Sequence, residues 1–208
     1  MKKFLLTIAL LPYLLLAGYS SHISSISPVV KKRMLTGASW RKGCPVPLSQ
    51  LRYLSMTYRG FDGRDHSGEM IVHQSVAREV TQIFGKLYVS KYPIKKMRLV
   101  SDYSASDFRS IEADNTSAFN CRPVTGGKKW SRHSYGKAID INPIENPYIS
   151  RSGRISHKKS LQFRKRNHRI TKATILKSDL IVKLFKARGW RWGGDWNSIK
   201  DYQHFDKR

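Results

Sequence analysis

Two short stretches of the sequence contain residues that can bind a metal ion. His133 is followed by Gly136 and, at the end of an apolar stretch, by Asp140. A turn at the glycine can bring the imidazole and the carboxylate to one point, and His204 near the end of the chain supplies a third ligand. Two imidazoles and a carboxylate are a donor set that zinc accepts. We therefore predict that His133, Asp140 and His204 hold a catalytic zinc ion, Zn2+, with one position open for water.

Asp201 lies three residues before His204 and is the candidate general base. Zinc lowers the pKa of a bound water molecule, but peptide hydrolysis also needs a group that accepts the proton of that water. A carboxylate at this spacing can lie beside the metal without binding it, and can later pass the proton to the leaving amine. The alternative, that all four are polar residues with ordinary roles, is disfavoured because the two stretches occur together.

Together these stretches resemble the M15 family of zinc peptidases. The family pattern is Ser-x-His-x-x-Gly-x-Ala-x-Asp, followed near the C-terminus by an acidic residue three positions before a histidine. Every defined position is filled here, by Ser131, His133, Gly136, Ala138, Asp140, Asp201 and His204. The family includes D-alanyl-D-alanine carboxypeptidases, VanY-like enzymes and L-alanyl-D-glutamate endopeptidases. The resemblance spans roughly residues 44–208. Many members carry glutamate where this chain has Asp201, which leaves the preferred bond open.

The resemblance also indicates residues that would contact the substrate. Family members place an arginine upstream of the histidine motif, and Arg122 is the candidate here, since a guanidinium can grip a carboxylate through two parallel bonds. The alternative is a structural ion pair with a nearby acid. Ser131 is assigned either to the substrate site or to support of the turn. Four aromatic residues either line a cleft or fill the core: Trp130, Tyr135, Trp192 and Trp196.

The remaining patterns predict a single α+β domain, a small antiparallel sheet with flanking helices. A length of 208 residues with 40% apolar residues suits one core. We expect one helix over residues 76–87, capped by Ser75, and another over residues 179–188, capped by Ser178 and ended by Gly189. Strands are expected at residues 70–72, 97–103, 138–142 and 202–206, and a loop at residues 57–68.

The N-terminus reads as an export signal. Lys2 and Lys3 precede an apolar run over residues 4–17 that is short for a membrane span. We expect a signal peptide at residues 1–20, a loosely ordered leader at residues 21–43 and the peptidase-like domain at residues 44–208, with a retained N-terminal anchor as the alternative. Export predicts a periplasmic or extracellular protein with no stable membrane span after cleavage.

Export also permits a disulfide between the two cysteines, Cys44 and Cys121. Two unpaired buried thiols are the alternative. Neither cysteine has a cysteine or histidine neighbour at the spacing of a zinc finger, so a cysteine-based zinc site is disfavoured.

The chain is strongly basic, with 39 Lys and Arg against 14 Asp and Glu and a net charge of +25. Such a surface attracts polyanions. The basic stretch at residues 157–169 reads as a solvated surface insertion, with a specific polyanion site as the alternative. We expect peptidoglycan peptides and anionic envelope polymers as partners, and no specific nucleic acid, because no nucleic-acid-binding motif is recognisable.

These observations predict an exported zinc metallopeptidase that hydrolyses peptidoglycan stem peptides. The bond is either a terminal D-Ala-D-Ala bond or an internal L-Ala-D-Glu bond. The rival interpretations are a non-catalytic, zinc-containing cell-wall-binding module and a nucleic-acid-binding protein.

Overall fold

A long β-hairpin is the largest sheet element of the protein. The computed structural model describes residues 18–124 and 126–208. In it, β2 (Leu51–Arg59) and β3 (Asp65–His73) pair antiparallel along their full length, and β1 (Ser21–Ser25) adds to the free edge of β2. The loop expected at residues 57–68 is therefore wrong. Residues 60–64 form the turn of the hairpin. The distal residues of β3 are exposed and polar although they are paired, whereas β2 alternates buried and half-buried residues along this stretch.

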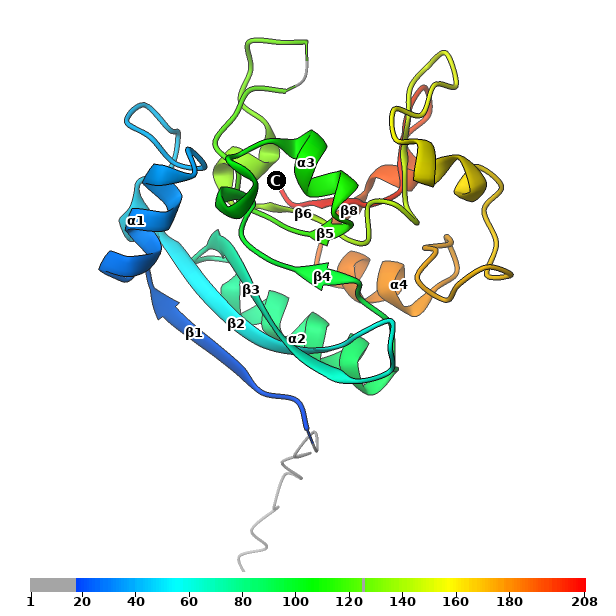
Figure 1. The fold of residues 1–208 in the computed structure, drawn as a ribbon, viewed down its shortest axis with the longest axis horizontal. Coiled ribbons are helices and arrows are strands. Elements are labelled where there is room, and N and C mark those ends of the chain that lie inside the picture. Colours follow the sequence, from blue (N-terminus) through cyan, green and yellow to red (C-terminus); the bar gives the residue numbers. More distant parts are fainter. Residues whose placement is uncertain (1–17, 125) are drawn as a thin grey trace, which may run out of the picture.

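The two faces of the hairpin are covered by different helices (Figure 1). The helix α2 (Ala77–Val89) packs its apolar stripe against Leu54, Met56 and Met70 on one face. This helix was predicted, but Ser75 does not cap it. Val76 occupies the N-cap position, and the hydroxyl of Ser75 lies 2.8 Å from Nδ1 of His73 instead.

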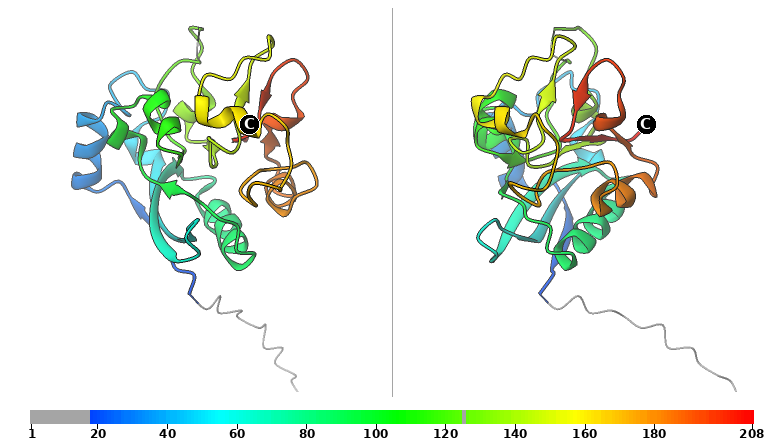
Figure 2. Two further views of the ribbon diagram at one scale, coloured as in Figure 1. Left: turned by 45° about the vertical axis from the view of Figure 1, so that its right-hand side comes forward. Right: turned by 90° about the vertical axis from the view of Figure 1, so that its right-hand side faces the viewer.

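The opposite face is covered by α1 (Pro28–Thr36), which the left view of Figure 2 shows across the hairpin from α2. Ser27 caps this helix by accepting a hydrogen bond from the amide of Val30. Met34 is 0% exposed and packs in one cluster with Leu51, Ile71 and Phe119. The loosely ordered leader expected at residues 21–43 is therefore wrong, because β1 completes a sheet and α1 buries apolar surface.

A second antiparallel sheet, in the order β6-β10-β8, supports the predicted metal ligands. It consists of β6 (Ala138–Asp140), β10 (His204–Asp206) and β8 (Arg191–Trp192). The helix α4 (Leu180–Lys186) covers its inner face, where the rings of Phe185 and Phe205 stack 4.2 Å apart. Strands and helices are thus mixed in one domain, and the predicted α+β class is confirmed.

Two short strand pairs and one more helix complete the fold. The strand β4 (Lys96–Met97) pairs parallel with β5 (Asn115–Thr116), and β7 (Tyr148–Ile149) pairs antiparallel with β9 (Lys200–Asp201). Between β4 and β5 lies α3 (Asp107–Glu112).

Several predicted boundaries are wrong. The strand expected at residues 97–103 ends at Met97, and residues 100–103 form a 3-10 turn. The strands expected at residues 138–142 and 202–206 are shorter, at β6 and β10. Asp179, not Ser178, precedes α4 at the N-cap. Within the basic stretch at residues 157–169, Phe163 is buried and Arg166 bonds to backbone carbonyls, so this stretch is partly built into the domain.

The expected export signal lies almost entirely outside the described residues, which begin at residue 18. In the part of the chain that the structure describes, no helix is both long enough and apolar enough to cross a membrane.

Candidate metal centre

The three predicted metal ligands lie together. His133, Asp140 and His204 each offer a ligand atom, and these atoms lie within 4.8 Å of one another. The pairing of β6 with β10 places His204 opposite Asp140, with Nδ1 of His204 2.9 Å from Oδ1 of Asp140. Nε2 of His133 lies 3.2 Å from Nδ1 of His204 and 3.2 Å from Oδ2 of Asp140. The three side chains therefore converge on one point.

A single 3-10 turn, residues 132–135, positions His133. Ser131 begins the turn, and its hydroxyl accepts a hydrogen bond from the amide of His133. Gly136 ends it with a φ of 64°, a left-handed conformation that favours glycine. A Cβ at this position would lie 2.5 Å from the amide nitrogen of His73, so only glycine lets the turn approach the hairpin this closely.

The donor set fits a zinc ion. Nδ1 of His133 donates a hydrogen bond to the carbonyl of Ala118 at 2.6 Å, which leaves Nε2 free as a ligand atom. His133 is 4% exposed and His204 7%, so the ligands are largely shielded from water. Two imidazole nitrogens and a carboxylate oxygen match the ligands of catalytic zinc sites.

Asp140 and His204 shift each other's pKa. Burial would raise the pKa of Asp140, but the charge and hydrogen bonds of His133 and His204 hold it well below its usual value. Burial would lower the pKa of His204, but the hydrogen bond and charge of Asp140 outweigh it and raise the pKa to about 9. The carboxylate of Asp140 therefore stabilises the protonated form of His204.

Asp201, the predicted general base, lies on β9 and lines the same cleft as the three ligands. Burial and the charge of Asp140 raise the pKa of Asp201 to about 6. Its Oδ1 is buried and has no hydrogen-bond partner among the described residues. A carboxyl group with a pKa close to neutrality is well matched to proton transfer.

The cleft has a volume of about 680 Å³, and apolar side chains form part of its wall. Of the four aromatic residues considered from the sequence, Trp196 lines the cleft, with its ring 5.5 Å from that of His204. Trp192 is buried in the main core, and Trp130 and Tyr135 pack against the cluster beneath α1.

Arg122 and Ser131 both line the cleft, and both also have structural partners. The guanidinium of Arg122 forms an ion pair with Asp107 and donates a hydrogen bond to the carbonyl of Pro123 at 3.0 Å. The structural alternative for Arg122 is therefore present in the structure, as is turn support by Ser131. A role of either residue in binding substrate stays a prediction.

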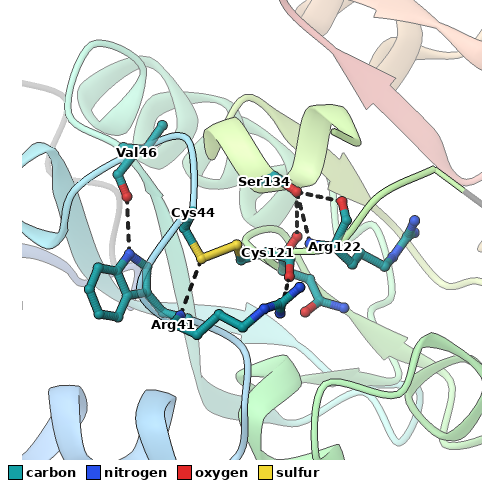
Figure 3. Close-up of a disulfide and its surroundings, with 8 residues drawn as sticks. Arg41, Cys44, Val46, Cys121, Arg122 and Ser134 are labelled. Carbon is teal, nitrogen blue, oxygen red and sulfur yellow. Dashed lines mark hydrogen bonds between the residues drawn. A yellow bond between two sulfur atoms is a disulfide. The ribbon is translucent and has the colours of Figure 1, made fainter. Parts of the chain in front are cut away.

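The segment that carries Arg122 is held from two sides (Figure 3). Cys121 is bonded to Cys44, which confirms the predicted disulfide. The side chain of Arg41 donates a hydrogen bond to the carbonyl of Cys121 at 2.7 Å. From the other side, the hydroxyl of Ser134 accepts a hydrogen bond from the amide of Arg122 at 2.9 Å. The N-terminal region thus braces one wall of the cleft.

Sequence reasoning missed several residues of the site. Arg132, Arg191 and Asp206 line the cleft, and the carbonyl of Ala118 orients His133. Asp206 could have been found, because residues two apart on a strand point to the same side and His204 was already assigned. The pairing of Arg191 with Asp206 depends on a strand register that the sequence does not reveal.

Comparison with known proteins agrees with this geometry. Residues 125–207 match a family model described as D-alanyl-D-alanine carboxypeptidase, of the M15 peptidases. The matched segment contains the three converging ligands and Asp201. No solved structure matches the chain significantly. The match confirms the resemblance to M15 peptidases.

Proposed function

We propose that this M15-type peptidase is an exported zinc enzyme that hydrolyses the stem peptides of peptidoglycan. One observation carries the proposal: two histidines, an aspartate and a further aspartate with a raised pKa line a single cleft. The three ligands supply what zinc requires, and the fourth residue supplies a proton acceptor.

Each residue of the site has a distinct role in this proposal. His133, Asp140 and His204 would hold the zinc ion, which when bound would supply Lewis acidity and lower the pKa of a water molecule. Asp201, ionised above its pKa of about 6, accepts the proton of the attacking water. The same carboxyl group then donates this proton to the amine that leaves.

The residues that line the cleft are suited to a peptide substrate that carries carboxylates. An apolar wall, including Trp196 and Phe108, can contact side chains, while Arg122 can grip a carboxylate if it exchanges Asp107 for the substrate. Ser131 would act beside the metal mainly by holding the turn of His133.

A location outside the cytoplasm is part of the proposal. The disulfide supports it, because such bonds persist in oxidising compartments. The net charge of +25 would concentrate the protein on anionic envelope polymers through long-range attraction.

The test is mass spectrometry of purified muropeptides incubated with zinc-loaded protein, with a chelated sample as control. Loss of a terminal D-alanine identifies a carboxypeptidase, and a freed L-alanine or a split stem identifies an endopeptidase. Unchanged muropeptides in the presence of bound zinc would overturn the proposal and favour a non-catalytic wall-binding module.

A further inference from the structure

Two arginines meet over a buried aspartate beside the metal ligands. The guanidinium of Arg191 forms an ion pair with Asp206, and Nε of Arg132 lies 3.7 Å from the same carboxylate. The side chain of Asp206 is 1% exposed, whereas those of Arg191 and Arg132 are 43% and 42% exposed. The aspartate is therefore buried beneath two half-exposed arginines, and all three residues line the cleft.

The strand register places this arginine pair next to the ligands. Asp206 follows His204 by two residues on β10, so both side chains lie on the same side of the sheet, while Phe205 between them enters the core. Asp140 lies opposite His204, and Arg191 lies opposite Asp206. The pair formed by Asp140 and His204 and the pair formed by Arg191 and Asp206 are separated by about 7 Å along β10, which is roughly the length of two residues of an extended peptide.

The charge balance of the cleft singles out this pair. Three arginines line the cleft among the residues that the structure describes: Arg122, Arg132 and Arg191. Arg122 is matched by Asp107. Arg132 and Arg191 share one carboxylate, Asp206, so together they retain one net positive charge and free N–H donors.

We propose that Arg132 and Arg191 form a second carboxylate-binding subsite, which selects peptides with a free carboxylate within about two residues of the scissile bond. This inference rests on the proposed function for the position of the scissile bond, and it names the substrate feature that the site recognises. Asp206 holds the two guanidinium groups in place, so that little side-chain freedom is lost when the substrate carboxylate binds.

The test compares a synthetic stem pentapeptide with counterparts in which one carboxylate at a time is amidated. Affinity is measured by calorimetry in a zinc-loaded Asp201→Asn background, which prevents turnover, and kcat/KM is measured in the protein with Asp201 intact. Arg132→Gln and Arg191→Gln remove the subsite. Arg98→Gln is the matched control, because Arg98 is also half-exposed and paired with acids, but lies outside the cleft. Melting temperatures establish that each variant is folded.

We expect each cleft variant to weaken binding of the free pentapeptide roughly 10- to 100-fold, the usual range for a charge-assisted hydrogen bond. One of the amidated peptides lacks the carboxylate that the subsite recognises. For that peptide, the cleft variants and the Arg98→Gln control should have equal affinities. If Arg191→Gln fails to fold because Asp206 loses its nearer partner, Arg132→Gln alone gives the answer.

Equal losses on the free and all amidated peptides, or no loss in a folded variant, would overturn the subsite. A wild type that binds the free pentapeptide selectively without cutting any peptide would refute the proposed function and leave the subsite standing. A wild type that cuts every peptide equally well would refute the subsite alone.

Discussion

Nδ1 of His133 donates a 2.6 Å hydrogen bond to the carbonyl of Ala118. This bond orients the buried imidazole of His133 toward the other two candidate ligands, Asp140 and His204. The neighbouring residue, Ser117, exchanges two backbone hydrogen bonds with Asp140, at 2.9 and 2.8 Å. One short segment therefore holds two of the three ligands in their relative positions. Such supporting contacts set the orientation and basicity of the ligands before a metal binds.

Gly193 determines how closely the turn before β9 approaches Asp201. A Cβ at residue 193 would lie 2.4 Å from the carbonyl oxygen of Asp201, so Gly193→Ala must displace the strand that carries the base. Because small displacements of a reacting group are costly, we expect kcat/KM to fall roughly 100-fold while the zinc content stays unchanged. Kinetics and metal analysis on the same preparation test this. Full activity in the variant would show that the position of Asp201 is not critical.

The disulfide should stabilise the protein substantially. Cys44 and Cys121 are separated by 77 residues, and a bond across so long a loop restricts the unfolded chain. We expect Cys44→Ser/Cys121→Ser to lose about 2–4 kcal/mol of unfolding free energy and roughly 5–15 °C in melting temperature. Reductant should lower the melting temperature of the wild type and leave that of the double variant unchanged. A wild type that is insensitive to reductant although its disulfide is reduced would contradict this.

Much of the site was predictable because its ligands are specified locally. His133, Gly136 and Asp140 encode a turn and a strand within eight positions, and His204 and Asp201 encode their own spacing. The helix α2 was equally clear, since its stripe is apolar at regular spacing. These elements can be predicted without knowing which distant segments they contact.

The rest depended on contacts between distant segments. Residues 21–36 look polar and basic, yet β1 is stabilised by backbone pairing with β2, which the sequence of β1 does not reveal. The arginine pair over Asp206 likewise arises from the register of β8 on β10. The outer part of β3 gives no strand signal because its residues 65–67 are polar and exposed, so the alternation that marks a strand is absent there.

The helix α1 is expected to contribute to the stability of the folded protein. Met34 is fully buried against Leu51, Ile71 and Phe119, so Met34→Ala should cost about 2–5 kcal/mol. Val29 lies on the same helix but is 71% exposed, and Val29→Ala should change stability by less than about 0.5 kcal/mol. Denaturant unfolding of both variants tests this. Equal, small effects would mean that α1 is only loosely attached.

A buried carboxyl pair should make stability depend on pH. Glu145 is 6% exposed, and burial together with the neighbouring Asp114 raises its pKa to about 8. A raised pKa in the folded state means that the protonated form favours folding. This contribution is complete below the unfolded value of about 4.5 and is lost as the pH rises through about 8.

The comparison of wild type with Glu145→Gln isolates this effect from other titrating groups. Between pH 5 and pH 8, the melting temperature of the wild type should fall relative to that of the variant by at least about 2–4 °C, the equivalent of about 1 kcal/mol. Parallel melting curves across this range would show that Glu145 does not titrate between the two pH values.

The central claim is that His133, Asp140 and His204 bind zinc whereas Asp201 transfers the proton. Measurement of zinc content together with muropeptide hydrolysis tests this claim most directly. His204→Ala should lose both zinc and hydrolysis, because only two ligands remain. Asp201→Asn should retain one zinc per chain and lose hydrolysis by about 100- to 10,000-fold, the usual contribution of a general base. A fully active Asp201→Asn protein, or a His204→Ala protein that keeps its zinc, would contradict the account.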